Sequence, residues 1–419
     1  QKRGVYMKLR DFSRPVQSRI ILRFISVITN TAVMPFIVLF FANEIGSVKV
    51  TILTLIIGVI GLFGSVIGGR ITDKKGRKPV ILIGESFTTL GFILLIVGQY
   101  STQYMVPLSL IAFTITNFFI GFSLPAYSAF ILDETTKETR KVIYAFTMWT
   151  GYLGFAIGSV IGGLLFADYK VFLFILIAAS SIINVIIIAL LIPETIHKAN
   201  IENIEIMKGE ENNEDEGTFK TIIFKNKVLV ILLFIGFVFQ LMDNQMGYYL
   251  SLYYYDLFAE QSYEILGFLR TENTIIAIVF LYAIKKYLTR FKEMNIALVG
   301  ASFLFIGYLL LSALQVELLL YGAMFIASIG EILLFPALQG ISANFIPPLY
   351  RGRYASLANI CGTVGALLAA LFMLFHTLHS PYIVTMIYTI IGLLTIWSLV
   401  RLRGLIQTIV GEKISNSIN

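Results

Sequence analysis

The feature that most constrains this chain is a series of apolar stretches, each about as long as one helix that crosses a bilayer. A spanning helix needs about 20 mostly apolar residues. Only 14% of the residues are charged, against about a quarter in soluble domains. The pattern predicts an all-α membrane protein with twelve transmembrane helices. These lie near residues 18–43, 48–69, 79–98, 104–131, 141–167, 171–192, 226–255, 262–286, 294–314, 317–342, 353–378 and 381–400.

The charged residues group these stretches into two bundles. Lys and Arg gather in every second connection, so the positive-inside rule places both termini in the cytoplasm. A hydrophilic stretch typical of a solvated linker separates two sets of six spans. The predicted parts are a cytoplasmic segment at 1–17, a six-helix bundle at 18–192, the cytoplasmic linker at 193–225, a second six-helix bundle at 226–402 and a cytoplasmic tail at 403–419. Residues 1–6 precede Met7, a candidate native start, and are interpreted as an expression remnant.

An internal repeat relates the two bundles. Positions 125 and 336 differ by 211, and this one shift brings further residues into register at matching span boundaries. Duplication of this kind is typical of secondary transporters. The pairs are Pro125-Ala126 with Pro336-Ala337, Asp133 with Asn344, Arg140 with Arg351, Gly151 with Gly362 and Gly154 with Gly365.

The reactive side chains exclude most enzymatic chemistry. The single cysteine, Cys361, lies in an apolar run, which excludes a disulfide framework and a multi-thiolate metal site. The three histidines, His197, His376 and His379, fall in loops or at span ends. We find no Walker loop, metal-binding cluster or nucleophile–base set. The sequence therefore predicts a protein that is not an enzyme and has no cofactor, metal or nucleic-acid partner. We expect it to be a monomer that draws its energy from an ion gradient.

A short loop between the second and third spans, "GGRITDKKGRKPV", carries the most specific motif. Its cations alone would suit a positive-inside loop, but that explanation leaves its glycines and its aspartate unexplained. The order G-x-x-x-D-x-x-G-R-K resembles the signature loop of the major facilitator superfamily. The resemblance implies that Asp73 and Arg77 join charge pairs that close the cytoplasmic side, with Arg140 as a candidate partner. The predicted cytoplasmic gate comprises Gly69, Asp73, Gly76, Arg77, Lys78 and Arg140.

The fifth span, "TGYLGFAIGSVIGGLLF", contains Gly154, Gly158 and Gly162 at intervals of four residues. Glycines on one helix face allow a neighbouring backbone to approach closely, so tight packing alone is one explanation. The other is a resemblance to the glycine motif of drug–proton antiporters, with Ser159 where that motif has proline. Asn117 stands where many of these exporters have arginine. With "LMDNQ" and "GEILLFPALQG", the chain resembles LmrP-like multidrug exporters of Gram-positive bacteria.

Acidic residues inside the spans are the candidates for proton coupling, because an intramembrane charge is costly enough to imply a function. Glu331 lies among apolar neighbours, about 20 Å along its helix from the outer end, and such surroundings disfavour an ionised carboxylate. Its alternatives are an ion pair with Arg270, interpreted as the one clearly intramembrane cation, and a neutral packed acid. Asp243 and Glu272 are further coupling candidates. Glu85 is expected to be hydrated near the cytoplasmic end of its span.

Polar and aromatic side chains at similar depth are the candidates for a substrate cavity. For each one, an interhelical hydrogen bond or plain packing is the alternative. Aromatic rings beside a buried acid would suit an amphipathic organic cation. The candidates are Asn30, Asn117, Trp149, Tyr152, Gln240, Asn244, Asn273, Phe335 and Asn359.

The leading hypothesis is a proton-driven antiporter in a bacterial plasma membrane that exports amphipathic, cationic small molecules by alternating access. Sodium is the alternative coupling ion, because carboxylates also bind it. The alternatives in function are an exporter dedicated to one metabolite or metallophore, a lipid translocase and an uptake symporter. In each case the partners are a small-molecule substrate, the coupling ion and membrane lipid.

Overall fold

The computed structural model describes residues 12–101, 103–135, 137–195, 226–288, 291–346, 351–378 and 381–418, and within them every regular element is a helix. The chain divides into two compact units, Gln1–Asn212 (unit 1) and Asn213–Asn419 (unit 2). Most of the predicted linker 193–225 and residues 1–6 lie outside the described residues.

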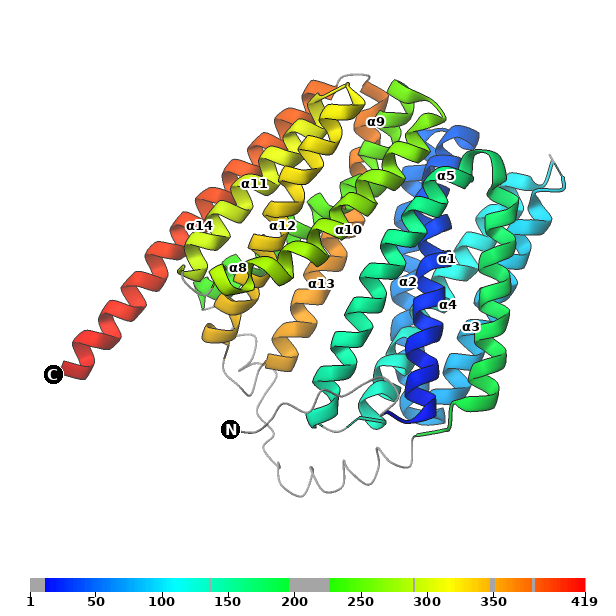
Figure 1. Ribbon diagram of the computed structural model, residues 1–419, viewed down its shortest axis with the longest axis horizontal. Helices are drawn as coiled ribbons and strands as arrows, with labels where there is room; N and C mark the ends of the chain where they lie inside the picture. Colours follow the sequence, from blue (N-terminus) through cyan, green and yellow to red (C-terminus); the bar gives the residue numbers. More distant parts are fainter. Residues whose placement is uncertain are drawn as a thin grey trace. The chain divides into compact units, whose positions relative to one another are not determined.

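Unit 1 is built from long helices that pack side by side (Figure 1). Helix α1 packs mainly against α5, and α4 packs against both α2 and α3. The helices are α1 (Arg14–Ile45), α2 (Ser47–Lys75), α3 (Arg77–Gly98), α4 (Met105–Asp133) and α5 (Lys137–Leu191).

Helix α5 is two helices joined at a sharp break. Its 55 residues would extend about 82 Å if straight, far more than the ~30 Å hydrocarbon core. Tyr169 has non-helical torsions, φ −122° and ψ 29°, and Figure 1 shows the ribbon of α5 rising and then returning in the opposite direction. Each part is long enough to cross a membrane.

Unit 2 is also helical, and two 3₁₀ segments, Asn244–Gly247 and Leu371–Leu378, interrupt its α-helices. The first follows Asp243, where α8 gives way to a single 3₁₀ turn, and Tyr248 then leaves the helical region at φ −121°, ψ −98°. A break of this kind frees backbone groups inside a span and is typical of transporter binding regions. The elements are α8 (Lys227–Asp243), η2 (Asn244–Gly247), α9 (Tyr249–Phe258), α10 (Gln261–Leu288), α11 (Glu293–Ala313), α12 (Glu317–Phe345), α13 (Arg351–Ala370), η4 (Leu371–Leu378) and α14 (Pro381–Ile418).

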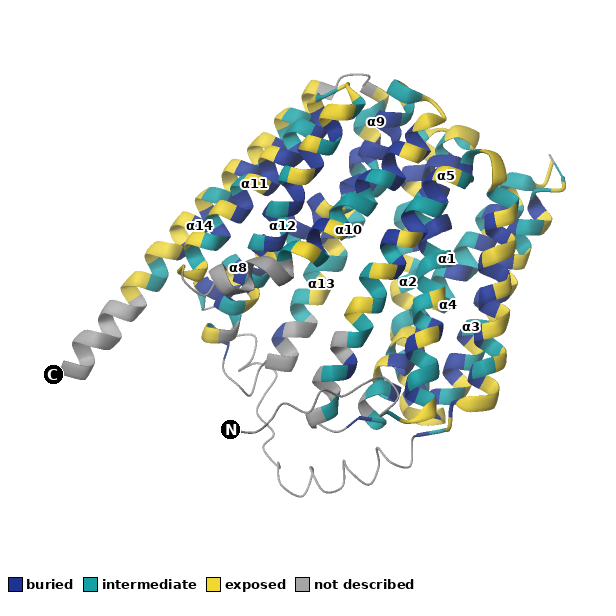
Figure 2. Ribbon diagram, in the orientation of Figure 1, coloured by how far each residue is buried: buried dark blue, intermediate teal, exposed yellow. Residues whose placement is uncertain are grey.

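Ten helical stretches of the described chain are long and apolar enough to cross a membrane. One of them, Phe146–Leu191, includes the break in α5, and α10 is outside the ten. Figure 2 shows exposed residues along one side of α14 and buried ones where α14 meets α11. Exposed apolar side chains such as Leu393 and Trp397 on α14 are what a lipid-facing surface requires.

Glycines set the closest helix contacts in unit 1. A Cβ atom on Gly68 would overlap the carbonyl group of Phe122, so α2 and α4 touch through their backbones. Along α5, Gly154, Gly158 and Gly162 all face α1, and a Cβ on Gly158 would collide with the carbonyl oxygen of Ile28. The glycine row of the fifth span therefore lies in a tight helix contact.

Candidate functional site

A carboxylate cluster joins α10 and α12 in unit 2. The Asn273 amide nitrogen donates to Glu331 Oε2 at 2.9 Å and lies 3.1 Å from Ser328 Oγ. Ser328 and Glu331 are three residues apart on α12 and so share one helix face. Ser328 in turn donates to the carbonyl of Met324 at 2.8 Å. Glu331 is thus a half-buried acid held from both helices.

Asp243 and Arg270 extend this cluster. Asp243 is the last residue of α8, directly before the 3₁₀ turn, and its carboxylate interacts electrostatically with both Arg270 and Glu331. The Arg270 guanidinium lies beside Gly247, so close that a Cβ there would be 3.2 Å from one of its nitrogens. Arg270 Nε is buried and has no hydrogen-bond partner among the described residues.

Asp243 interacts electrostatically with Arg270 without forming an ion pair with it. No carboxylate oxygen of a described residue is recorded within 4.0 Å of an Arg270 nitrogen. The hypothesis of a Glu331–Arg270 ion pair is therefore wrong for this structure, because Asn273 occupies the Glu331 carboxylate instead. We call Asp243, Arg270, Asn273, Ser328 and Glu331 the acid cluster.

Glu272 lies apart from the acid cluster. It lines a pocket of about 570 Å³ with Phe268, Tyr321 and Phe325 from α10 and α12. Its Oε2 is buried without a hydrogen-bond partner among the described residues. The sequence analysis named both Glu272 and Glu331 as candidate coupling acids, but the structure records no contact between these two described residues.

The signature loop between α2 and α3 is anchored by contacts within unit 1. Arg77 Nε donates to Asp133 Oδ2 at 2.8 Å, and both side chains are only 10% exposed. The Glu194 carboxylate accepts from the backbone nitrogens of Arg77 and Lys78 at 3.0 and 3.1 Å, which caps the start of α3. Gly76 has φ +100°, and a Cβ on it would collide with Glu194. This position therefore requires glycine.

These contacts change the predicted gate. The charge partner of Arg77 is Asp133 at the end of α4, whereas Asp73 is exposed and has no recorded partner among the described residues. Lys78 donates to the carbonyl of Ala189 at 2.8 Å. The Arg140 side chain lies outside the description. Sequence spacing within the loop could not identify Asp133, which is 56 residues away from Arg77.

The predicted cavity residues are divided between the units. Three amides, those of Asn30, Asn117 and Asn244, each donate to the carbonyl oxygen four residues earlier in the chain, at 2.8 Å. Local bonds of this kind hold the amides against their own helices.

The other predicted cavity residues differ in exposure. Phe335 stacks on Phe239 with 5.6 Å between ring centroids. Gln240 Oε1 is 3.5 Å from the Asn244 amide nitrogen. Trp149 and Asn359 are exposed, and Tyr152 is half-buried.

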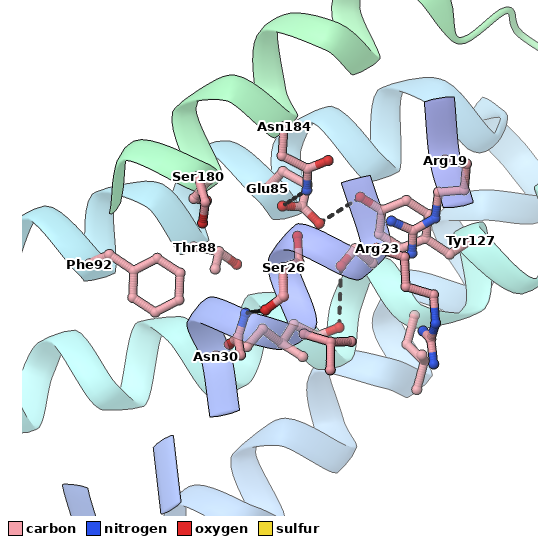
Figure 3. Close-up of a pocket in the computed structure, with 15 residues that line it drawn as sticks. Arg19, Arg23, Ser26, Asn30, Glu85, Thr88, Phe92, Tyr127, Ser180 and Asn184 are labelled. Carbon is pink, nitrogen blue, oxygen red and sulfur yellow. Dashed lines mark hydrogen bonds between the residues drawn. The ribbon is translucent and has the colours of Figure 1, made fainter. Parts of the chain in front are cut away.

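Unit 1 contains a cavity with several polar side chains in its lining (Figure 3), of which sequence reasoning had named only Asn30 as a cavity residue. Its cavity measures about 230 Å³ and is lined by side chains from α1, α3, α4 and the second part of α5. Tyr127 donates to Glu85 Oε1 at 2.6 Å, and the Asn184 amide donates to Glu85 Oε2 at 2.7 Å. Glu85, expected to be hydrated, is half-buried, and each of its oxygens accepts a hydrogen bond from a side chain.

Two arginines complete this site. Arg19 lies over the ring of Tyr127, with its guanidinium carbon 3.4 Å from the ring centroid, and Arg23 lines the same cavity one helical turn later. Arg270 is consequently not the one clearly intramembrane cation. The spacing of Arg19 and Arg23, four residues apart inside an apolar helix, was the signal available in the sequence.

Comparisons with known proteins agree on the class of protein. A Na(+), Li(+), K(+)/H(+) antiporter of Planococcus maritimus is 22% identical over 384 residues, which cover 87% of this chain and 89% of that protein. The class D tetracycline resistance protein of Salmonella ordonez is 28% identical over 316 residues, covering 72% and 74%. The crystal structure of the peptide transporter POT in complex with alafosfalin superimposes with a TM-score of 0.72 at 14% identity, covering 97% and 96% of the two chains, which indicates a shared fold.

The family assignment rests on the match along most of the sequence. The sequence pattern of the Major Facilitator Superfamily matches residues 20–370, and most helices of that region are long and apolar enough to span a membrane. This chain belongs to the Major Facilitator Superfamily and is a multi-pass membrane transporter rather than an enzyme.

Proposed function

We propose that this chain is a proton-coupled antiporter that exports amphipathic, cationic small molecules by alternating access. The observation that carries the proposal is the acid cluster of unit 2, in which Asp243 interacts electrostatically with both Glu331 and Arg270. A proton taken up by either acid removes one negative charge from a site that a cationic substrate would otherwise neutralise. Proton and cargo would then compete for the same carboxylates, which is the basis of exchange.

The membrane arrangement proposed here has twelve spans. It counts α5 as two crossings on either side of Tyr169 and includes α10, which carries Glu264, Arg270 and Glu272. Both termini face the cytoplasm of a bacterial cell, in accord with the positive-inside rule. In this arrangement the Arg77–Asp133 pair lies at the cytoplasmic end of unit 1 and serves in the gate.

The named relatives support exchange and export in different ways. The antiporter of Planococcus maritimus is named for exchanging alkali cations with protons, which favours monovalent cation–proton exchange as a second candidate function. The tetracycline resistance protein is named for resistance to a drug, which favours an organic cargo. LmrP-like specificity, a dedicated metabolite or metallophore exporter, a lipid translocase and an uptake symporter remain finer alternatives that differ in cargo or direction.

The test is transport by the purified full chain in lipid vesicles with an imposed pH gradient. One assay follows a lipophilic cationic dye, and a second follows proton release on addition of sodium or potassium ions. We expect the wild-type protein to move the dye in the direction opposite to the protons, at a rate that depends on the pH gradient. The Glu331→Gln variant should lose this dependence while still binding dye. Glu264→Gln, at an exposed position of α10, is the matched control and should behave as wild type.

The outcomes separate the candidates. Ion-dependent proton release without dye transport would favour alkali cation exchange. Gradient-driven transport that survives in Glu331→Gln would contradict the role of the acid cluster. Dye movement in the same direction as the protons would indicate a symporter.

A further inference from the structure

The cavity of unit 1 has an imbalance of charge that the proposed transport cycle does not use. Arg19 and Arg23 both line it, and Glu85 is its one acidic lining residue. The two arginines lie four residues apart on α1, so they share one helix face. They are close enough that the charge of Arg19 acts on Arg23.

Glu85 forms no recorded ion pair with either arginine. Its two oxygens are bonded to Tyr127 and Asn184 at 2.6 and 2.7 Å, and Figure 3 shows it between those two side chains. No guanidinium nitrogen of Arg19 or Arg23 is recorded within 4.0 Å of a carboxylate oxygen of a described residue. The Nε atoms of both arginines are buried and have no hydrogen-bond partner among the described residues.

Two half-buried cations that share one acid, with no ion pair to it, are unfavourable inside a membrane protein. Each loses part of its hydration, and each raises the electrostatic cost of the other. Arg19 recovers some of this energy through its contact with the Tyr127 ring. Arg23 has no such contact recorded. Their donors are thus available to a ligand.

We propose that this cavity binds an oxyanion, a phosphate or carboxylate group, between Arg19 and Arg23. A guanidinium presents paired donors that match the spacing of phosphate and carboxylate oxygens. The cavity volume of about 230 Å³ exceeds the ~30 Å³ share of one water molecule several times, so a phosphate with accompanying water fits. The cationic lining disfavours a metal ion or an organic cation at this place.

The anion has two sources with the same chemistry. It is either the headgroup of an anionic lipid or a soluble anion. The site lies wholly within unit 1 and stands whether or not the acid cluster of unit 2 couples transport to protons.

The experiment measures binding to the purified full chain in neutral detergent. The probes are inorganic phosphate, succinate, and mixed micelles with phosphatidylglycerol, with phosphatidylcholine micelles as the uncharged comparison. The variants are Arg19→Gln and Arg23→Gln, and the control is Arg14→Gln, an exposed arginine on the same helix. Affinity is obtained by calorimetry and by the rise in unfolding temperature with probe concentration.

We expect at least one probe to bind the wild type and the Arg14→Gln control equally. Binding to either cavity variant should be roughly tenfold weaker or more, because a charge-assisted hydrogen bond is lost. Binding of phosphatidylglycerol alone identifies a lipid headgroup as the occupant. Binding of phosphate or succinate identifies a soluble anion.

A second measurement separates a lost site from a damaged fold. Without any anion, the cavity variants should unfold at the same temperature as the wild type or higher, because one of two repelling charges has been removed. The proposal is overturned if no probe binds the wild type, or if the cavity variants bind the probes as tightly as the wild type.

Discussion

The polar interior of unit 1 is built around arginines, whereas that of unit 2 is built around acids. In unit 1, the acid Glu85 is fully bonded and Arg19 and Arg23 retain free donors. In unit 2, Arg270 is the single cation of the acid cluster and interacts with Asp243, which in turn interacts with Glu331. Two clusters of opposite charge can bind chemically different species, which two clusters of the same charge could not do.

The two units also differ where a polar contact joins the end of one helix to the start of another. Asp133 of unit 1 accepts a hydrogen bond from Arg77 at the start of α3. Its repeat counterpart in unit 2, Asn344, lies 3.4 Å from Glu293 at the start of α11. The first contact is a buried ion pair, and the second is an exposed amide–acid contact. A contact between two helices is therefore present at both places, but it is an ion pair only in unit 1.

The largest expected effect concerns the acids of the two units. Glu331→Gln should abolish transport driven by a pH gradient, because the amide cannot release a proton. Glu85→Gln should keep the gradient dependence, since the bonded acid of unit 1 is not part of the exchange. Vesicle transport of a cationic dye measures both. If both variants lose the dependence of transport on the pH gradient, the acids of the two units do not differ in function.

The next effect concerns the bundle ends. Arg77→Ala leaves Asp133 buried without its cation and should cost about 3–5 kcal/mol of stability. Glu293→Gln, at the corresponding exposed contact of unit 2, should change stability by less than about 1 kcal/mol. Thermal unfolding of the purified variants in detergent gives the order. Equal losses would show that the two ends are equally dependent on charge.

A smaller effect is expected in the glycine row of α5. Gly158→Ala should destabilise unit 1 by about 1–3 kcal/mol, because the added Cβ meets the carbonyl oxygen of Ile28. Gly151→Ala on the same helix should be neutral, since no atom lies within 4 Å of that position. The repeat counterpart of Gly158 in unit 2 is already an alanine, Ala369. An unchanged unfolding temperature in Gly158→Ala would mean that α1 can move away at little cost.

The smallest effect is expected from single hydroxyl or amide donors. Tyr127→Phe removes the bond to Glu85 and should cost about 1–2 kcal/mol without altering the gradient dependence of transport. Asn273→Ala removes the bond to Glu331 at a similar cost and should also shift the pH at which transport is half-maximal. Parallel unfolding and pH–rate measurements test the pair. An identical pH profile in Asn273→Ala would separate Asn273 from coupling.

Sequence reasoning reached the fold class because bilayer length and hydrophobic runs are local properties. It also named Asp243 and Glu331 as candidate coupling acids, since an acid in an apolar run is visible in the chain itself, and their role stays a prediction. It missed Glu85 because that acid lies near a span end, where hydration is the ordinary expectation. It also missed Asp133 as the partner of Arg77, because the pair joins α3 to the end of α4.

The sequence by itself determined an α-helical membrane transporter with a signature loop, a glycine row and acids within its spans. Only the tertiary structure decided which groups meet: Asn273 with Glu331, Asp133 with Arg77, and Glu85 with Tyr127 and Asn184. The physical reason is that helix length and amphipathicity are set over a few turns. A partner on another helix depends on the rotation and depth of both helices, which close glycine contacts fix only when the bundle packs.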